Sequence, residues 1–372
     1  MGASGSIGTQ TIDVIKQHPD ELKLVGVSVG KNIDFLIDIL KYFSVRYVYT
    51  IEKNEVLEEN FPDVRFFFGE NGLKQMAELS DYDMLVNALV GFTGFLPTLA
   101  AIRNHKDIAL ANKETLVAGG ALINEAIREY GVKLFPIDSE HAAILQCLQG
   151  HPKEDVRRLI ITASGGAFRD LDRSQLEDVT KEQALAHPNW NMGEKITIDS
   201  ATMMNKGFEV IEAKWLFDLD PDRINVVVHP ESVIHSMVEF VDGAVIAQLG
   251  CPDMREPIGF ALSFPRRLTI GNKKLDFAAL GGLTFEAPDT ARFPCLTLAF
   301  EALRRGGNAP CALNAANEVA VAAYLKDLIS FYDIAKIGER ALSGLNFVAD
   351  PSLDDIFATN REVSTIADGY IH

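Results

Sequence analysis

The stretch Gly2-Ala3-Ser4-Gly5-Ser6-Ile7-Gly8 opens the chain and runs directly into a helical pattern over residues 9–17. Its glycines have a G-x-x-G-x-x-G spacing. Glycine allows the backbone to approach a pyrophosphate, and the free N–H groups of a helix N-terminus attract its negative charge. An ordinary glycine turn would have the same spacing, so the secondary structure that follows decides whether the stretch is a nucleotide-binding turn.

Residues 1–138 alternate short apolar runs with helical stretches. The strand-like runs are 22–28, 47–49, 84–89 and 108–111, and the helical stretches include 33–43 and 120–130. Such alternation predicts βαβ units and a parallel sheet covered by helices on both faces. With the glycine stretch in front, it indicates an α/β fold that begins with a Rossmann-like nucleotide-binding domain over residues 1–138.

Three further regions are predicted after this domain. Residues 139–262 indicate a central α/β domain that contains a long, polar, flexible loop at about 168–195. Its strand-like runs are 158–162, 225–229 and 244–248. Residues 263–292 carry several Pro, Gly and Asn residues and are predicted to be a connector. Residues 293–372 are helical in pattern throughout and indicate a C-terminal α-helical bundle.

Charge and cysteine content exclude several classes of protein. Lys and Arg number 35 and Asp and Glu number 52, which gives a net charge of −17. Nucleic-acid and anionic-membrane binders normally carry a basic excess, so we expect neither partner. The uncharged run 84–102 is interrupted by Gly91, Gly94 and Pro97, so we interpret it as a strand, a turn and a helix start rather than a membrane span. Four scattered cysteines without a C-x-x-C pair favour free thiols and a cytoplasmic location.

The nucleotide preference is predicted from the end of the strand-like run 22–28. A site specific for NAD would carry an acidic residue at this point to bind the ribose 2′-hydroxyl. The chain instead continues Val29-Gly30-Lys31-Asn32. A cation and an amide suit a 2′-phosphate, so we expect NADP.

Two acidic motifs are candidates for a metal site. Asp138 and Glu140 come after an apolar run, and in an extended chain residues i and i+2 point the same way. Converging carboxylates favour a hard cation such as Mg²⁺ or Mn²⁺. Glu209 and Glu212 are spaced i, i+3 on a predicted helix and would share one face. A solvated acidic loop or helix cap, and solvated glutamates on an amphipathic helix, remain the alternatives.

Three polar motifs are candidates for anion binding. Asn205 and Lys206 stand at a predicted helix entrance, where N–H donors and the helix dipole favour a phosphate. The run 162–166 leads from a strand into two glycines, and 111–114 comes after another strand, at the sheet edge where α/β proteins bind ligands. A surface lysine, a plain turn and a solvated loop are the respective alternatives.

Together these motifs resemble the 1-deoxy-D-xylulose 5-phosphate reductoisomerase family over essentially the whole chain. Six blocks occur in the family's order, namely Gly2 to Gly8, Ala111 to Glu114, Pro136 to His141, Ala163 to Gly166, His187 to Gly193 and Asp199 to Glu212. The resemblance implies a homodimer that isomerises and reduces 1-deoxy-D-xylulose 5-phosphate to 2-C-methyl-D-erythritol 4-phosphate. It further implies NADPH and a divalent cation, Mg²⁺ or Mn²⁺, with Co²⁺ as a further candidate.

The resemblance also assigns roles to individual residues. Asp138, Glu140 and Glu209 would bind the cation, with Glu212 supporting them. Ser139 and Lys113 would contact substrate oxygens. The residues implied around the substrate phosphate are Ser164, Ser200, Asn205, Lys206 and, from the loop, His187, with Trp190 and Met192 closing over the site.

The cofactor residues implied by the resemblance fall into three groups. The pyrophosphate turn is Ser4, Gly5, Ser6 and Ile7; the adenosine-phosphate loop is Gly30, Lys31 and Asn32; and Asn112, Glu114 and Gly193 line the rest of the cofactor. The family also places a β-strand before the glycine turn, whereas only Met1 stands there in this chain. We therefore expect the natural protein to start several residues upstream.

Two other functions are compatible with an NADP-binding fold. Another NADP-dependent dehydrogenase, such as a semialdehyde dehydrogenase, would need an activated cysteine nucleophile, and no cysteine lies in a motif that suggests activation. A non-catalytic NADP-binding sensor would be expected to have lost some of the metal-binding carboxylates. Asp138, Glu140 and Glu209 are all present, which favours the enzyme.

Overall fold

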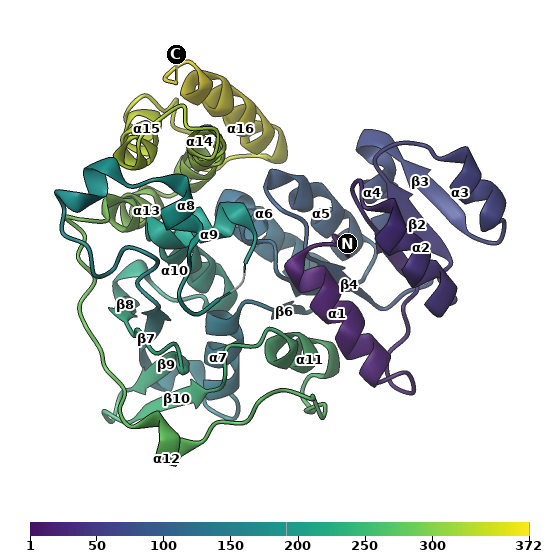
Figure 1. The fold of residues 1–372 in the computed structure, drawn as a ribbon, viewed down its shortest axis with the longest axis horizontal. Coiled ribbons are helices and arrows are strands. Elements are labelled where there is room, and N and C mark those ends of the chain that lie inside the picture. The colour runs from purple at the N-terminus through teal and green to yellow at the C-terminus, as the bar shows by residue number, and fades with distance from the viewer. Residues whose placement is uncertain (191, 372) are drawn as a thin grey trace. The chain divides into compact units, whose positions relative to one another are not determined.

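The computed structural model describes residues 1–190 and 192–371, whose helices and strands are labelled in Figure 1. The fold is α/β, with parallel strands in the N-terminal part and a helical C-terminal part, as predicted. Two compact units are present. The first comprises Met1–Thr115, Ile123–Asp138 and Asp253–Asn272, and the second comprises Leu116–Leu122, Ser139–Pro252 and Lys273–His372.

The first unit contains two three-stranded parallel sheets, each with helices around it. Their strands are, in order, β1 (Gly26–Ser28), β2 (Tyr47–Thr50) and β3 (Arg65–Phe68), then β4 (Met84–Asn87), β5 (Asp107–Leu110) and β6 (Leu134–Pro136). The helices are α1 (Ser6–Gln17), α2 (Ile33–Tyr42), α3 (Glu55–Asn60), α4 (Gly69–Ala77), α5 (Phe95–Arg103), α6 (Lys113–Tyr130) and α11 (Arg255–Ser263). This arrangement brings the carboxyl end of each strand to the start of a helix or loop.

Residues 1–3 join the carboxyl ends of β1 and β4. The backbone N–H of Ala88 donates to the Met1 carbonyl at 3.0 Å, and the N–H of Ala3 donates to the Ser28 carbonyl at 2.9 Å. A cavity of about 510 Å³ extends from Met1 between the two strands, and its lining includes Ile15 of α1 and Leu85 of β4.

The second unit is built on a mixed four-stranded sheet in the order β10-β9-β7-β8. The strands are β7 (Val156–Ala163), β8 (Ile224–Val228), β9 (Ile234–Phe240) and β10 (Val245–Leu249). Strand β7 pairs in parallel with β8, while β9 runs antiparallel to both β7 and β10. The helices before the C-terminal region are α7 (Ser139–Cys147), α8 (Lys181–Leu185), α9 (Glu194–Ala201), α10 (Met204–Phe217) and α12 (Phe277–Leu280).

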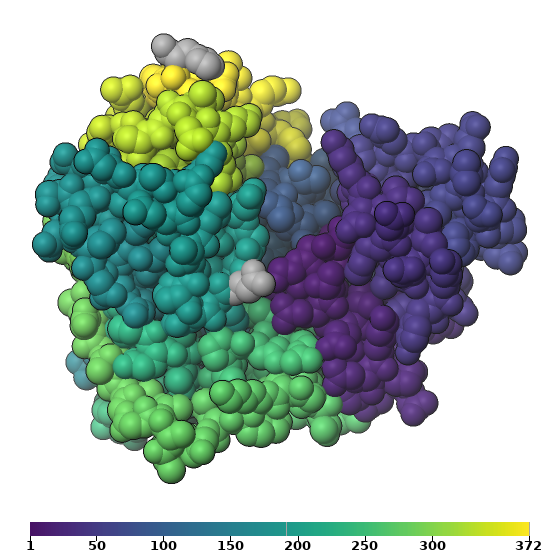
Figure 2. Space-filling model, viewed as in Figure 1, coloured from purple at the N-terminus to yellow at the C-terminus, as the bar shows by residue number. Residues whose placement is uncertain are grey.

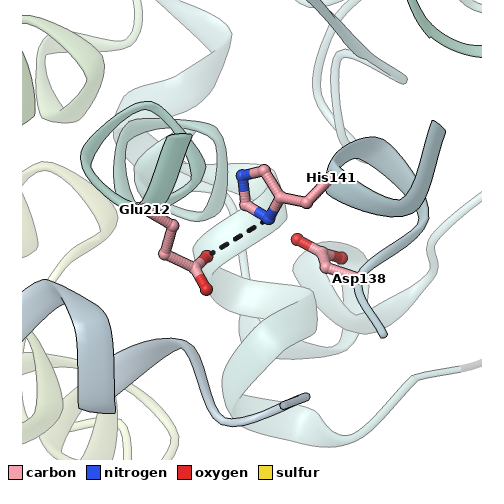
Figure 3. A group of neighbouring side chains, drawn as sticks. All are labelled: Asp138, His141 and Glu212. Carbon is pink, nitrogen blue, oxygen red and sulfur yellow. Dashed lines mark ion pairs between the residues drawn. The ribbon is translucent and has the colours of Figure 1, made fainter. Parts of the chain in front are cut away.

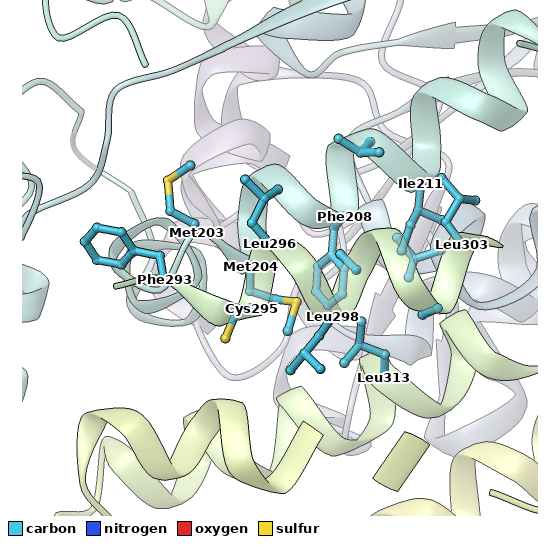
Figure 4. Close-up of a cluster of buried hydrophobic side chains, with 14 of the residues drawn as sticks. Met203, Met204, Phe208, Ile211, Phe293, Cys295, Leu296, Leu298, Leu303 and Leu313 are labelled. Atoms are coloured by element: carbon cyan, nitrogen blue, oxygen red, sulfur yellow. The ribbon is translucent and has the colours of Figure 1, made fainter. Parts of the chain in front are cut away.

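The C-terminal helices pack directly on α10. They are α13 (Pro294–Arg305), α14 (Ala309–Tyr324), α15 (Phe331–Ser343) and α16 (Leu353–Asp368). Figure 4 shows Phe208 and Ile211 of α10 among Leu296, Leu298 and Leu303 of α13, all in one buried cluster. Burial of a large apolar side chain contributes about 1.5–3 kcal/mol, so this cluster holds α10 firmly in place.

The predicted loop at 168–195 contains regular structure. A 3₁₀ turn covers Gln175–Asp178, and α8 comes next, with a capping box in which Thr180 and Gln183 bond reciprocally. The segment lies against the C-terminal helices, as the teal and yellow-green surfaces in Figure 2 show, and Lys181 Nζ pairs with Asp327 at 2.5 Å. A long polar run thus folds because the helices of the C-terminal region support it.

The compact units do not match the predicted boundaries at residues 262 and 292. Residues 253–272 group with the first unit, where Arg255 of α11 pairs with Asp13 of α1 at 3.1 Å. The remainder of the predicted connector contains α12 and a β-bridge between Val228 and Glu286. Residues 293–372 group with the central region because α13 covers α10.

Individual elements agree with most of the predicted runs. The stretch 84–102 forms β4, a 3₁₀ turn at Phe92–Gly94 and most of α5, as interpreted. None of the described helices combines the length and apolar character needed to cross a membrane. Strands β3 and β9 were not predicted, although residues 234–240 alternate in a way that fits a strand.

Candidate active site

Three carboxylates converge where α7 begins beside α10. Asp138 immediately precedes α7, Glu140 lies in its first turn and Glu209 comes from α10. One oxygen from each lies within 4.8 Å of the others. Hard carboxylate oxygens in this number and spacing fit Mg²⁺ or Mn²⁺.

The reason predicted for this convergence was wrong. Helix α7 starts at Ser139, so Asp138 and Glu140 are not successive same-face residues of an extended strand. They meet because a helical first turn presents Glu140 toward α10. Ser139 is buried there, and its hydroxyl donates to Glu140 at 2.5 Å.

The two solvated alternatives for α10 are also wrong. Glu209 is 1% exposed, Glu212 4% and Lys206 4%. Charges at such depth persist only when they are paired or bind an ion. The i, i+3 spacing therefore places both glutamates on a buried face.

Lys206 is the cation of this buried group. Its Nζ lies 2.6 Å from Glu140 Oε1 and also bonds to Glu209. Burial disfavours the charged ammonium, but Glu140 and Glu209 outweigh that effect and raise the pKa of Lys206. Asn205 Nδ2 donates to the other oxygen of Glu209 at 2.6 Å, so both residues of the predicted anion motif contact the carboxylates.

His141 is a further member of the group, and no role was predicted for it from the sequence. The ring is fully buried; its Nε2 lies 2.9 Å from the Glu209 carbonyl oxygen and its Nδ1 lies 3.9 Å from Glu212. Figure 3 shows the ring between Glu212 and Asp138. The carbonyl can only accept, so Nε2 carries a proton and donates. The signal in the sequence was its i+3 spacing from Asp138.

Lys113 and its neighbours lie at the carboxyl end of β5. Asn112 caps α6 by accepting from the Thr115 N–H at 3.1 Å, and Lys113 forms a buried ion pair with Asp138. Asn112 also donates to the Gly91 carbonyl and to Glu114, each at 2.9 Å. A solvated loop is therefore excluded for these residues.

Ser164 lies in a turn of closely packed backbone after β7. Its hydroxyl lies 2.9 Å from His187 Nε2 and accepts from the Gly166 N–H at 3.2 Å. Gly166 has φ +71° and packs so closely on Ser200 that an added Cβ would lie 2.5 Å from the Ser200 carbonyl oxygen. Two serines predicted around the phosphate thus lie on neighbouring backbone segments.

His187 is neutral near pH 7 and its tautomer is defined. Its Nδ1 accepts from the N–H groups of Asn189 and Trp190, at 3.2 and 3.0 Å, so Nε2 carries the proton and donates to Ser164. Burial, reinforced by the charge of Arg169, lowers the pKa of His187 to about 4. Arg169, which donates to the Ser164 carbonyl at 3.2 Å, was not predicted.

A second histidine near this segment was missed as well. His235 of β9 is buried, and its ring lies 6.1 Å from that of Trp190. Burial lowers its pKa, with the charge of Glu140 acting in the opposite sense. Met192 is half-buried, and Asn191 of the same block lies outside the described residues.

The glycine turn of the first unit has the geometry of an anion site. Gly2 has φ +78°, and Gly8 packs so tightly that an added Cβ would lie 2.2 Å from the Gly2 carbonyl oxygen. Gly5 is the N-cap of α1, and no side chain of the described residues caps that helix. Its open N–H groups are suited to a pyrophosphate.

The remaining cofactor candidates are spread over both units. Gly30 and Lys31 are exposed after β1, and Asn32 caps α2 by accepting from Phe35 N–H at 3.1 Å. Gly193 is the N-cap of α9 in the second unit.

Family models match most of the chain, and relatives match nearly all of it. Residues 1–120 match 1-deoxy-D-xylulose 5-phosphate reductoisomerase, 134–217 match the C-terminal domain of the same description, and 249–366 match the DXP reductoisomerase C-terminal domain. A reductoisomerase of Geobacillus sp. (strain WCH70) is 52% identical over 366 residues, covering 97% of this chain and 96% of the relative. One from Exiguobacterium sp. is 53% identical over 368 residues, covering 98% and 95%.

Solved structures give the same result. The Zymomonas mobilis reductoisomerase in complex with NADPH superposes with a TM-score of 0.93 at 44% identity, covering 100% of this chain and 97% of that one. A DOX-P reductoisomerase in complex with NADPH, fosmidomycin and magnesium superposes with a TM-score of 0.94 at 41% identity, with the same coverage. This chain belongs to the 1-deoxy-D-xylulose 5-phosphate reductoisomerase family.

Proposed function

We propose that this protein converts 1-deoxy-D-xylulose 5-phosphate to 2-C-methyl-D-erythritol 4-phosphate with NADPH and a divalent cation. The observation that carries the proposal is the buried convergence of Asp138, Glu140 and Glu209 in a chain that belongs to the reductoisomerase family. A nucleotide-binding sensor would have no need for three carboxylates this close together. A semialdehyde dehydrogenase would need a reactive thiolate, whereas burial raises the pKa of Cys295 and of Cys311 to about 12.

Asp138, Glu140 and Glu209 would hold the cation. When bound, the cation supplies Lewis acidity to the substrate's oxygens and orients them. Lys113 pairs with Asp138, and Ser139 donates to Glu140. Both residues therefore contact the proposed metal ligands and would contact substrate oxygens. His141 donates to the Glu209 carbonyl and so holds the backbone of one ligand in position.

Ser164, Ser200, Asn205, Lys206 and His187 would bind the phosphate. The neutral Nε2–H of His187 and the serine hydroxyls are donors, and Lys206 is a buried cation. Trp190 and Met192 would close over the bound substrate and exclude water before hydride transfer.

NADPH would be bound mainly by backbone of the first unit. Ser4, Gly5, Ser6 and Ile7 form the turn at the open N-terminus of α1, which suits the pyrophosphate. The residues proposed for the rest of the cofactor are Gly30, Lys31 and Asn32 for the adenosine phosphate, and Asn112, Glu114 and Gly193 elsewhere.

The active form would be a homodimer in the cytoplasm. Strand β10 is an edge strand, and its Val245 and Ile246 are 50% and 36% exposed. Unpaired edges with apolar residues favour pairing with another chain. All four cysteines are free, which suits a reducing compartment. Light scattering would give the oligomeric state.

The test is NADPH oxidation by the purified protein with 1-deoxy-D-xylulose 5-phosphate, measured by nicotinamide absorbance and product identification. We expect oxidation that stops with EDTA and returns with excess Mg²⁺ or Mn²⁺. NADPH binding without oxidation would instead support the sensor, and oxidation indifferent to EDTA would contradict the metal site.

A further inference from the structure

A buried polar group of the second unit lies beside the proposed phosphate site and has no part in the function described above. Asp199 of α9 is 2% exposed and directly precedes Ser200. Its Oδ1 accepts from Asn317 Nδ2 of α14 at 2.7 Å, and its Oδ2 lies 3.0 Å from Lys195 Nζ, one turn earlier on α9. Asn317 is 1% exposed. A carboxylate at this depth needs both partners.

Lys195 links this group to the helix that carries the proposed metal and phosphate ligands. Its Nζ lies 5.3 Å from the centroid of the Phe208 ring, and Phe208 immediately precedes Glu209 on α10. The ammonium therefore joins α9 to α10 while it neutralises Asp199. Asn317 ties the same carboxylate to the C-terminal helices.

Ser200 is held from two sides as a result. On one side Gly166 packs on its carbonyl, and the Met203 N–H donates to that carbonyl at 3.2 Å. On the other side Asp199 fixes the end of α9 to α14. Rotation of α9 would move Ser200 relative to Gly166, which lies two residues after Ser164.

The charges of Lys195 and Asp199 also affect phosphate binding. A bare carboxylate next to a phosphate dianion would repel it, and such repulsion is weakly screened in a buried place. The Lys195–Asp199 pair is neutral as a whole. Loss of the lysine alone would leave a negative charge beside the phosphate, whereas loss of both charges would not.

We propose that Asp199 is a positioning residue for phosphate binding, with Lys195 as its charge partner and Asn317 as its anchor to the C-terminal helices. The proposal rests on the proposed function, since the phosphate is that of the sugar substrate. It predicts that removing the charge of Lys195 while keeping that of Asp199 lowers the affinity for phosphate specifically.

The test compares Lys195→Met, Asn317→Ala and the double variant Lys195→Met/Asp199→Asn with wild type. We expect Lys195→Met to raise the KM for the sugar phosphate by about tenfold and to leave the KM for NADPH within about twofold. Asn317→Ala should raise the first KM by a few fold. The double variant should recover most of the loss because no uncompensated charge remains.

Titration with inorganic phosphate, read as protection against thermal unfolding, gives a second measurement that does not depend on turnover. The control is Lys336→Met, which removes the cation of an exposed Lys–Asp pair on α15 and should change neither value. Equal rises in both KM values, or no recovery in the double variant, would overturn the proposal.

Failure of the proposed function has a different signature. In that case wild type itself would not oxidise NADPH with the sugar phosphate, and phosphate titration of the same variants would still decide the role of Asp199. If Lys195→Met does not fold, the double variant and Asn317→Ala carry the comparison.

Discussion

Lys206 Nζ lies 2.6 Å from Glu140 Oε1 and also bonds to Glu209, so a buried ammonium stands among the carboxylates proposed to bind the cation. The ammonium offsets only one of the two negative charges, so one negative charge remains on this group without a metal. A divalent cation placed on the same carboxylates would experience repulsion from this lysine. The lysine is proposed to bind the substrate phosphate, so cation, substrate and Lys206 are coupled through charge.

Lys206→Met should therefore change the two affinities in opposite directions. A unit charge about 4 Å away is worth about 4 kcal/mol at an effective dielectric constant of 20, so Mn²⁺ should bind at least about tenfold more tightly. The KM for the sugar phosphate should rise far more than that for NADPH. Mn²⁺ titration by electron paramagnetic resonance measures the first effect. Lys214→Met, on the same helix, is the control, and unchanged or weaker Mn²⁺ binding would contradict the coupling.

Asp138→Asn tests the carboxylate group itself. The substitution removes one charged oxygen from the proposed ligand set and leaves Lys113 without its ion pair. Mutation of residues that only hydrogen-bond to metal ligands lowers metal affinity or activity by about 10–100-fold. For the loss of a ligand itself we expect turnover and Mn²⁺ affinity to fall by at least about 100-fold. NADPH affinity, measured by fluorescence titration, should be unchanged. Asp222→Asn, at an exposed pair with Arg304, is the matched control, and near-normal turnover of Asp138→Asn would reject the metal assignment.

Much of the fold could be predicted because its signals are local. The runs near 47–49 and 84–89 are apolar blocks bounded by turn residues, and β2 and β4 lie there. The glycine turn is a local motif as well. Strand β3, Arg-Phe-Phe-Phe, was missed although Pro62 and Asp63 precede it, Gly69 follows it and phenylalanine favours strands. The predicted loop at 168–195 contains α8, whose capping box of Thr180 and Gln183 is a local signal that was overlooked, whereas its contact between Lys181 and Asp327 is not local.

The residues of the candidate site also separate into those marked by local motifs and those defined only by the folded structure. Asp138, Glu140 and Glu209 were identified through motifs, but the geometry that joins them involves two helices separated by some 70 residues and could not be read from spacing. Arg169 contacts Ser164 through a hydrogen bond to its carbonyl, and the His235 ring lies beside that of Trp190, so no local pattern marks either residue. Burial of Lys206 and Glu209 likewise depends on α7, whose Glu140 and His141 contact them, and not on the motif.

The pH dependence of stability should contain a contribution from His187. Its pKa is lowered to about 4 in the folded chain, against about 6.5 when unfolded. Above pH 6.5 the His187 ring is neutral in both the folded and the unfolded state, so it does not change the stability. As the pH falls from 6.5 toward 4 only the unfolded chain gains the proton, so the folded state loses stability.

His187→Gln removes this titration while keeping a donor for Ser164. The free energy of unfolding, measured in urea at pH 7 and at pH 5, should fall more between the two values for wild type than for the variant. Carboxylates that titrate in the same range are common to both proteins and cancel in the difference. An equal fall in the two proteins would show that His187 is not held neutral.

Gly8→Ala tests the glycine turn with a backbone contact that no side chain can avoid. Gly8 lies inside α1, where alanine is favoured over glycine by about 1 kcal/mol, so an unhindered position would be stabilised. Here an added Cβ would lie 2.2 Å from the Gly2 carbonyl oxygen and 2.5 Å from the Ala3 Cα, so the turn must open. Gly5→Ala is the matched control, because its Cβ would meet only the Gly2 carbonyl oxygen, at 3.4 Å.

We expect Gly8→Ala to lower the free energy of unfolding by about 1–3 kcal/mol, the usual cost of overpacking. Gly5→Ala should change it by less than about 1 kcal/mol, since alanine at an N-cap loses only a modest preference relative to glycine. Opening the turn also moves the N–H groups that face the proposed pyrophosphate, so Gly8→Ala should weaken NADPH binding as well. Urea unfolding and NADPH titration on both variants separate the two effects, and a Gly8→Ala protein as stable as wild type would show that the close approach of Gly8 to Gly2 is not required.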